Sequence, residues 1–189
     1  MLLAMFATAA AGDHPSLSAE AAEAVLREAS VFRGAAVGYA GTTPGEVRAF
    51  RRVLGSRDGA TRFGRVAARG TLAGRLYALC GLFFLDIPAF EKELARLRQT
   101  DATVQRQEGC IVFEESLSSV LASAPGAPRM SHSGSFREWL RIGFVASARD
   151  VAGGSTCYHL RFGNKVPDAW LKDPSRAPEG GPPADDESR

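Results

Sequence analysis

The stretch that decides the fold runs from residue 71 to residue 85 and reads TLAGRLYALCGLFFL. Apolar residues cover every side of a helix drawn through it, and Arg75 is its single charged residue. A helix that is hydrophobic all round is buried by other elements. Thr71 can cap its first turn. Gly74 and Gly81 weaken helix propensity, which indicates that a neighbouring element approaches closely at each. We therefore predict a central buried helix here.

Four more helices are predicted around this one, each preceded by a residue that can cap its free amides. Their ranges and capping residues are 18–29 with Ser18, 44–54 with Thr43, 58–69 with Asp58, and 87–99 with Asp86. The segment from Thr43 to Glu46 has the pattern of a capping box, with Pro44 at the first helical position. The short connectors are typical of helices packed as antiparallel neighbours.

The rest of the chain has weaker patterns. Residues 34–42 are interpreted as a loop, because glycines flank Tyr39 and Ala40. After residue 100, short runs of Val, Ile and Phe predict strands near 103–104 and 109–113. Further along we expect a helix at 117–121, a loop at 122–135, a helix over 135–140, a strand at 144–145 and a half-buried strand at 155–162.

The predicted fold is mainly α. It is a compact helical bundle or a short HEAT-like α-hairpin array, with a small β-containing C-terminal region. One globular domain is expected over residues 18–171, helical over 18–99 and mixed with short strands over 103–165. Residues 172–189 are rich in Pro, Gly, Ser and acids, which predicts a disordered tail.

The charge balance excludes some classes of partner. The net charge is +2, from 23 basic and 21 acidic residues, so we expect no nucleic acid partner. Eight arginines between residues 48 and 75 form a loose basic stretch, which helical spacing spreads over several faces. No run of about 18 apolar residues occurs, so no membrane span is expected.

The first residues are apolar and end in small side chains. Residues 1–17 are therefore interpreted as the remnant of a signal peptide, although the basic start of such a peptide is missing. This interpretation predicts a periplasmic or secreted protein. The alternative is a frayed apolar tail on a cytoplasmic protein.

Three cysteines allow one disulfide and one free thiol if the chain is exported. We expect Cys80 and Cys110 to form the bridge, since both lie in apolar runs. Cys157 could replace either partner, because connectivity cannot be read from sequence. In a cytosolic protein all three would be reduced.

The only candidate catalytic residues are Cys157 and His159, which lie on the same side of the strand expected there. A Cys–His pair can act as a nucleophile and base, but no motif surrounds it. A zinc site with His132 lacks the usual ligand spacing. The glycines at 38–45 lack the lysine of a phosphate loop. No cofactor or metal is predicted.

The run from Gly74 to Leu82, followed by Asp86, Phe90 and Gly109-Cys110, resembles an uncharacterised family of bacterial exported proteins. The helix pair over 58–85 and 87–99 is similar in style to a HEAT-type hairpin. The resemblance covers about residues 35–115. It implies export, and it implies no catalytic residue, because the family carries no established activity.

Three functional hypotheses follow. The first is a non-enzymatic exported protein of the periplasm, envelope or exterior that binds a protein partner. The second is a thiol-dependent enzyme that uses Cys157 and His159. The third is a cytosolic adaptor with a basic helical face.

Overall fold

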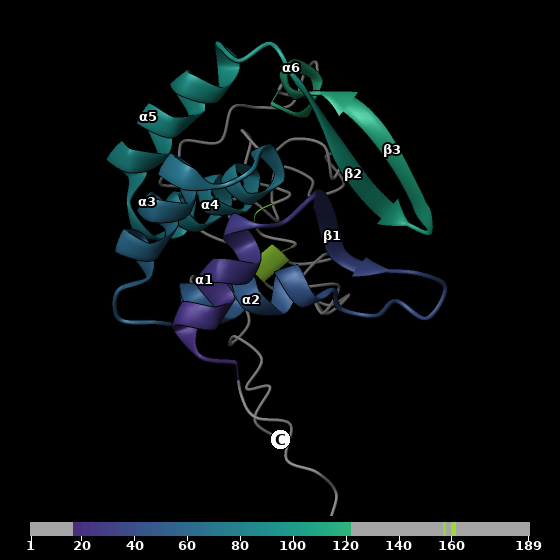
Figure 1. The fold of residues 1–189 in the computed structure, drawn as a ribbon, viewed down its shortest axis with the longest axis horizontal. Coiled ribbons are helices and arrows are strands. Elements are labelled where there is room, and N and C mark those ends of the chain that lie inside the picture. Colours follow the sequence, from purple (N-terminus) through teal and green to yellow (C-terminus); the bar gives the residue numbers. More distant parts are fainter. Residues whose placement is uncertain (1–16, 122–156, 158–159, 162–189) are drawn as a thin grey trace, which may run out of the picture.

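The computed structural model describes residues 17–121, 157, 160 and 161. Within them the chain is mostly helical and carries one three-stranded sheet (Figure 1). The elements in order are α1 Ala19–Arg27, β1 Val31–Val37, α2 Gly45–Leu54, α3 Gly59–Arg69, α4 Leu72–Leu85, α5 Ile87–Arg98, β2 Thr103–Gly109, β3 Ile111–Ser116 and α6 Leu117–Val120. The prediction of a mainly α fold with a small β region is confirmed.

Helix α4 is the centre of the molecule, as its sequence predicts. All residues from Ala73 to Phe83 are buried apart from Arg75. A Cβ on Gly74 would collide with the carbonyl of Leu26 in α1, and a Cβ on Gly81 would collide with the ring of Phe63 in α3. The two glycines therefore let α1 and α3 pack directly against the α4 backbone.

Helix caps are confirmed at three of the five predicted positions. Ser18, Thr71 and Asp86 each accept a hydrogen bond from a first-turn amide. The capping box at Thr43 is wrong, because α2 begins at Gly45 and Pro44 takes the cap position without a side-chain bond. Asp58 precedes α3 but does not cap it; its carboxylate accepts from Arg62 one turn later, at 2.8 Å.

The predicted loop over residues 34–42 is half wrong, because a strand occupies its first part. Strand β1 pairs in parallel with β2, from Val31 opposite Gln105 to Val37 opposite Gly109. Figure 1 shows β1 between the helices and the other two strands. Tyr77 of α4 holds β1 in place, because its hydroxyl oxygen accepts a hydrogen bond from the Arg33 amide at 2.8 Å.

Strands β2 and β3 form an antiparallel hairpin, which confirms β structure on both sides of residue 109. Gly109 and Cys110 are its two turn residues, and Gly109 has φ +55°. This fits a type II′ turn, which needs glycine at its first central position. Helix α6 follows directly, as predicted.

The half-buried strand expected over residues 155–162 is also wrong where the chain is described. Cys157, Leu160 and Arg161 have helical backbone, and the first two are fully buried. Helical spacing places residues three apart on one face, whereas the strand would have placed them on opposite faces. The predictions for residues 1–16, for 122–145 and for the tail lie outside the described residues.

Candidate functional site

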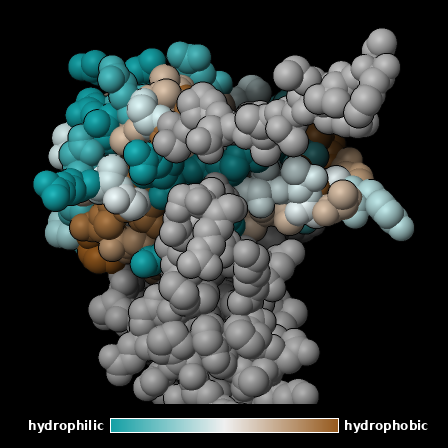
Figure 2. All heavy atoms as spheres, turned by 90° about the horizontal axis from the view of Figure 1, so that it is seen from below, coloured by the Kyte–Doolittle hydropathy of each residue, from teal (hydrophilic) through white to brown (hydrophobic). Residues whose placement is uncertain are grey.

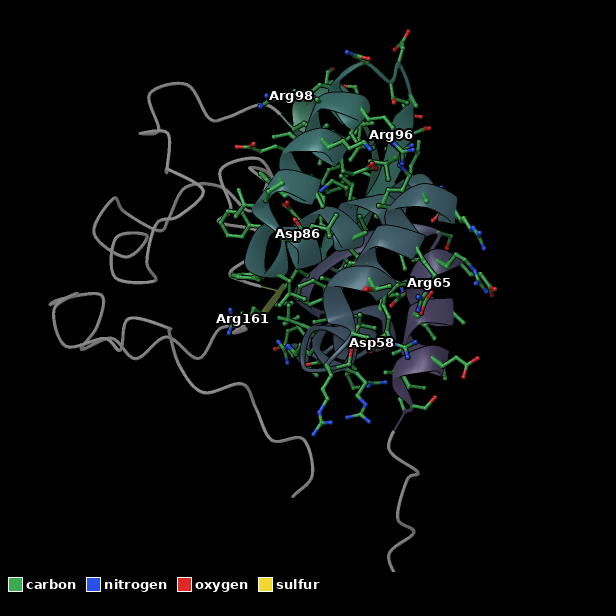
Figure 3. The ribbon with its side chains drawn as sticks, turned by 90° about the vertical axis from the view of Figure 1, so that its left-hand side faces the viewer. Asp58, Arg65, Asp86, Arg96, Arg98 and Arg161 are labelled. Atoms are coloured by element: carbon green, nitrogen blue, oxygen red, sulfur yellow. A yellow bond between two sulfur atoms is a disulfide. The ribbon has the colours of Figure 1, made fainter. Side chains whose placement is uncertain are left out.

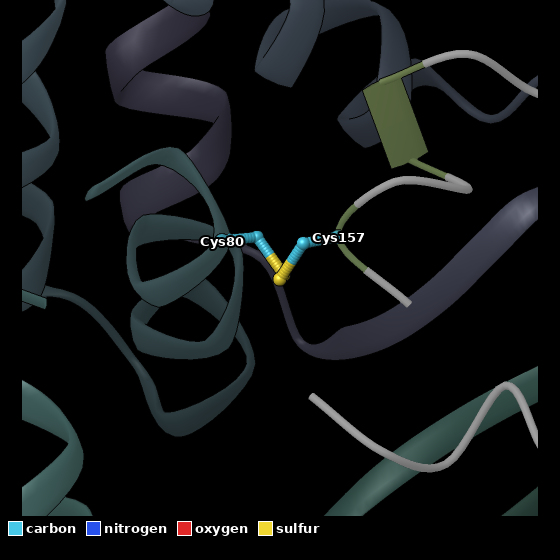
Figure 4. The surroundings of a disulfide bond; sticks show 2 residues. All are labelled: Cys80 and Cys157. Atoms are coloured by element: carbon cyan, nitrogen blue, oxygen red, sulfur yellow. A yellow bond between two sulfur atoms is a disulfide. The ribbon is translucent and has the colours of Figure 1, made fainter. Parts of the chain in front are cut away.

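The expected bridge between Cys80 and Cys110 is wrong. Cys80 in α4 is bonded instead to Cys157, with Cα atoms 4.9 Å apart (Figure 4). Both residues have an exposed fraction of 0%. Cys110 is free and exposed in the β2–β3 turn. The turn position explains the error, because it carries Cys110 away from the core that encloses Cys80.

The bond removes the chemistry predicted for Cys157. The nucleophile in thiol catalysis is a thiolate, and the sulfur of Cys157 is held by Cys80. His159 lies outside the described residues. The structure therefore does not bring a catalytic pair together at this position.

Two further contacts fasten the segment around Cys157 to the helices. The guanidinium of Arg51 in α2 donates to the carbonyl of Leu160 at 2.9 Å. The guanidinium of Arg161 lies 4.7 Å from the ring centroid of Phe84 in α4. Together with the disulfide, these contacts indicate a structural junction between distant parts of the chain.

The part of the chain that the structure describes has neither a metal-binding cluster nor a membrane-spanning helix. No group of three or more His, Cys, Asp or Glu side chains there could hold a metal ion. None of its helices has both the length and the apolar character needed to cross a membrane.

The arginines of the basic stretch are engaged with acceptors in the protein. Six of them donate to carboxylates or carbonyls: Arg48, Arg51, Arg52, Arg62, Arg65 and Arg75. Figure 3 shows Asp58 and Asp86 on the same side of the helical layer as Arg65, Arg96 and Arg98. This mixture of signs gives little support to a basic face for an acidic partner.

Glu23 is the centre of the best-formed ion cluster. Its buried carboxylate accepts from Arg65 at 2.7 Å and from Arg62 at 2.9 Å, which links α1 to α3. The hydrogen bond from Arg65 lowers the pKa of Glu23, and the bond from Arg62 acts in the same direction. A carboxylate paired in this way is part of the packing between helices rather than an acid or base.

Among the described residues, Tyr39 is the strongest candidate for contact with a partner, because its side chain is fully exposed. It lies in a turn closed by two hydrogen bonds of 2.9 Å between Val37 and Thr42. Gly38 and Gly41 have φ of +72° and +63°, a conformation that glycine adopts without strain. The turn therefore presents the Tyr39 ring to solvent in a defined place.

A second turn meets the first at the same end of the sheet. The amide of Gly38 donates to the carbonyl of Gly109 at 2.9 Å, and both turns project from the body of the molecule (Figure 1). Next to Gly109 the side chains of Ile111 and Val112 are 68% and 51% exposed. We call Tyr39, Cys110, Ile111 and Val112 the sheet tip.

The other large apolar side chains that are exposed among the described residues are Leu17 just before α1, Val25 in α1 and Leu85 at the end of α4. Figure 2 shows a brown, apolar area at the left of the molecule. The sheet tip consists of four exposed residues, two in turns and two at the start of β3. Exposed apolar residues at one end of a sheet are candidates for contact with a partner.

Strand β3 extends the site along the sheet. It is the last strand of the sheet, and no described strand pairs with its outer side. Glu108 and Ile111 face each other across the two-residue turn, so their backbone groups are hydrogen-bonded to each other. The next facing pair, Gln107 and Val112, is not hydrogen-bonded, because the two kinds of pair alternate along an antiparallel ladder. The amides and carbonyls of Val112 and Glu114, and the amide of Ser116, therefore point away from β2, whereas the carbonyl of Ser116 starts the hydrogen bonds of α6. We call these three residues the open edge.

Neither part of this site was singled out by the sequence. The segment from Gly109 to Phe113 is predicted as a core strand. A short apolar run has no alternation that would indicate which of its side chains are exposed. A signal was present in Glu108-Gly109-Cys110-Ile111, where glycine at the first of two turn positions is typical of a type II′ hairpin.

Comparisons with known proteins found no matching family model, no matching curated protein and no matching solved structure.

Proposed function

We propose that the chain is an exported, non-enzymatic protein that binds a protein partner through the sheet tip. The observation that carries the proposal is the exposure of Tyr39 in its turn and of Ile111 and Val112 at the start of β3, all at one end of the sheet. Tyrosine and aliphatic side chains presented together are typical of the centre of protein interfaces.

The disulfide supports the exported half of the proposal. Disulfides form and persist in the periplasm and outside the cell, and they are rare in the cytosol. A fully buried bridge between Cys80 and Cys157 is therefore more compatible with a periplasmic or secreted protein than with a cytosolic adaptor. In this proposal the helices over 58–85 and 87–99, which resemble a HEAT-type hairpin in sequence, are the scaffold that carries the sheet.

The intact mass of the chain isolated from the cell that makes it tests export. We expect a mass that shows loss of a leader and formation of one disulfide. A full-length chain with three free thiols would overturn this half of the proposal and return the cytosolic adaptor as the working hypothesis.

Binding is tested by comparing variants of the folded protein as bait. Tyr39→Ser with Ile111→Thr removes the apolar side chains of the sheet tip and leaves the core untouched. If the tip is the centre of the interface, capture of the partner falls by about tenfold or more. Val25→Thr, at an exposed position of α1, is the matched control and should leave capture unchanged. Equal capture by both variants would exclude the sheet tip.

A further inference from the structure

We propose that the open edge of β3 takes up an extended segment of the protein partner as a fourth strand, with a basic residue opposite Glu114 and an apolar residue opposite Val112. This inference rests on the proposed function and specifies the chemistry of the partner. Adding a strand to an exposed sheet edge gives affinity through backbone hydrogen bonds and specificity through alternate side chains.

The backbone of the open edge is suited to such pairing. Val112 and Glu114 direct their amide and carbonyl groups away from β2, Ser116 directs its amide the same way, and all three residues are exposed. Unpaired edges of this kind are a template for another strand. The hairpin that carries them is held to the body by the pairing of β2 with β1 and by the buried side chain of Leu117.

The side chains on the outer face of the open edge define what the added strand should carry. Val112 and Glu114 lie two residues apart and therefore on the same face. Val112 is 51% exposed. Glu114 accepts a hydrogen bond from Thr103 at 2.6 Å, but no described base forms an ion pair with it. A lysine or arginine on the added strand would supply that missing charge.

The acids on the inner face share a base, whereas Glu114 has none among the described residues. Glu115 lies on the inner face and accepts from the buried guanidinium of Arg106 at 2.8 Å. Arg106 also pairs with Glu108 at 3.0 Å. The inner face therefore holds its own counter-charge, whereas the outer face leaves one for a partner.

A second copy of this chain fits the open edge less well. Strand β3 reads IVFEES and has no basic residue. In antiparallel pairing of two such strands, Glu114 would face an apolar residue, a serine or another Glu114, and like charges directly opposite are destabilising. A partner strand with the pattern apolar-x-basic, in either direction, satisfies both positions.

The test uses a displayed library of randomised octapeptides, selected on the folded, oxidised protein. We expect enrichment of peptides with Lys or Arg two positions from Val, Ile or Leu. In the complex, hydrogen exchange at the amides of Val112 and Glu114 should slow, because a new strand covers them.

Four variants, two of them controls, test the two positions separately. Glu114→Lys should weaken the selected peptides about tenfold and shift a fresh selection to acidic residues at that position. Asp101→Lys makes the same change in net charge at an exposed loop residue and should change nothing. Val112→Pro removes an outward amide, which an edge strand tolerates, and it should abolish binding, whereas Val112→Thr should retain it.

The outcomes separate this inference from the proposed function. Absence of enrichment, or selection of acidic peptides by the unaltered protein, overturns the inference and leaves the capture test of the sheet tip standing. Peptides that bind without protecting Val112 and Glu114 also overturn it, and then locate the contact elsewhere. Protection of the same amides in a concentration-dependent dimer would assign the edge to a second copy instead.

Discussion

Cys80 and Cys157 are joined although they lie 77 residues apart in the sequence, and both are fully buried. Cys80 lies at the centre of the most apolar helix, where the surrounding helices exclude water. The bond therefore fixes a distant segment of the chain against the middle of the core. Exposed Cys110 is left as the one cysteine that solvent reaches.

Alkylation before and after reduction tests this pairing. Without reductant, one cysteine should react, and peptide mapping should identify it as Cys110. Closing a loop of this length stabilises the fold by about 4 kcal/mol in the chain-entropy model. We therefore expect Cys157→Ala to lower the unfolding free energy by a large fraction of that value, and Cys110→Ala to leave it unchanged. Rapid alkylation of Cys80 in the folded protein would contradict the pairing.

The close packing of α3 on α4 makes a second prediction. Gly81→Ala places a methyl group against the ring of Phe63, which is fully buried and has no room to move. Overpacking of this kind costs about 1–3 kcal/mol of unfolding free energy.

Gly64→Ala in α3 is the matched control, because a Cβ there meets nothing within 4 Å. Alanine favours helix over glycine by about 1 kcal/mol, so this variant should be slightly more stable than the parent. Denaturant unfolding measures both. A neutral Gly81→Ala variant would show that α3 and α4 are further apart than described.

The ion cluster at Glu23 makes the stability depend on pH. Hydrogen bonds from Arg65 and Arg62 lower the pKa of Glu23 in the folded protein below the value of 4.5 that it has when unfolded. Its contribution is therefore fully present above pH 4.5 and is lost as the pH falls through the lower, folded pKa. Thermal unfolding between neutral pH and pH 3 should show this loss.

Glu23→Gln should reduce the unfolding free energy at neutral pH by about 2 kcal/mol, since it removes charge-assisted hydrogen bonds. It should also flatten the acid limb of the pH profile. Glu28→Gln, one turn further along the chain and exposed, is the control and should change neither. If Glu23→Gln does not change how the stability falls at acid pH, other carboxylates cause that loss of stability.

The parts of the fold that could be predicted are those determined locally. Thr71 and Asp86 cap their helices because a side-chain oxygen three residues before an amide is a local signal. The burial of α4 follows from its composition. Gly74 and Gly81 mark close approaches because glycine in a helix otherwise costs stability.

The parts that were missed depend on contacts between residues far apart in the chain. Strand β1 has the sequence VFRGAAV, and its pairing with β2 places Val31 opposite Gln105. No local sequence pattern indicates this pairing. The partner of Cys80 is equally non-local. Ile111 and Val112 are exposed because they lie at the end of a sheet, whereas their apolar sequence predicts a core strand.

The measurement that tests the central claim most directly is site-specific crosslinking in the cell that makes the protein. A photoreactive phenylalanine analogue is placed at position 112 in the sheet tip, or at position 25 on the exposed side of α1. We predict one defined crosslinked product from position 112, in a compartment outside the cytosol, and none from position 25. The same products from both positions, or none from position 112, would contradict the proposed partner-binding role of the sheet tip.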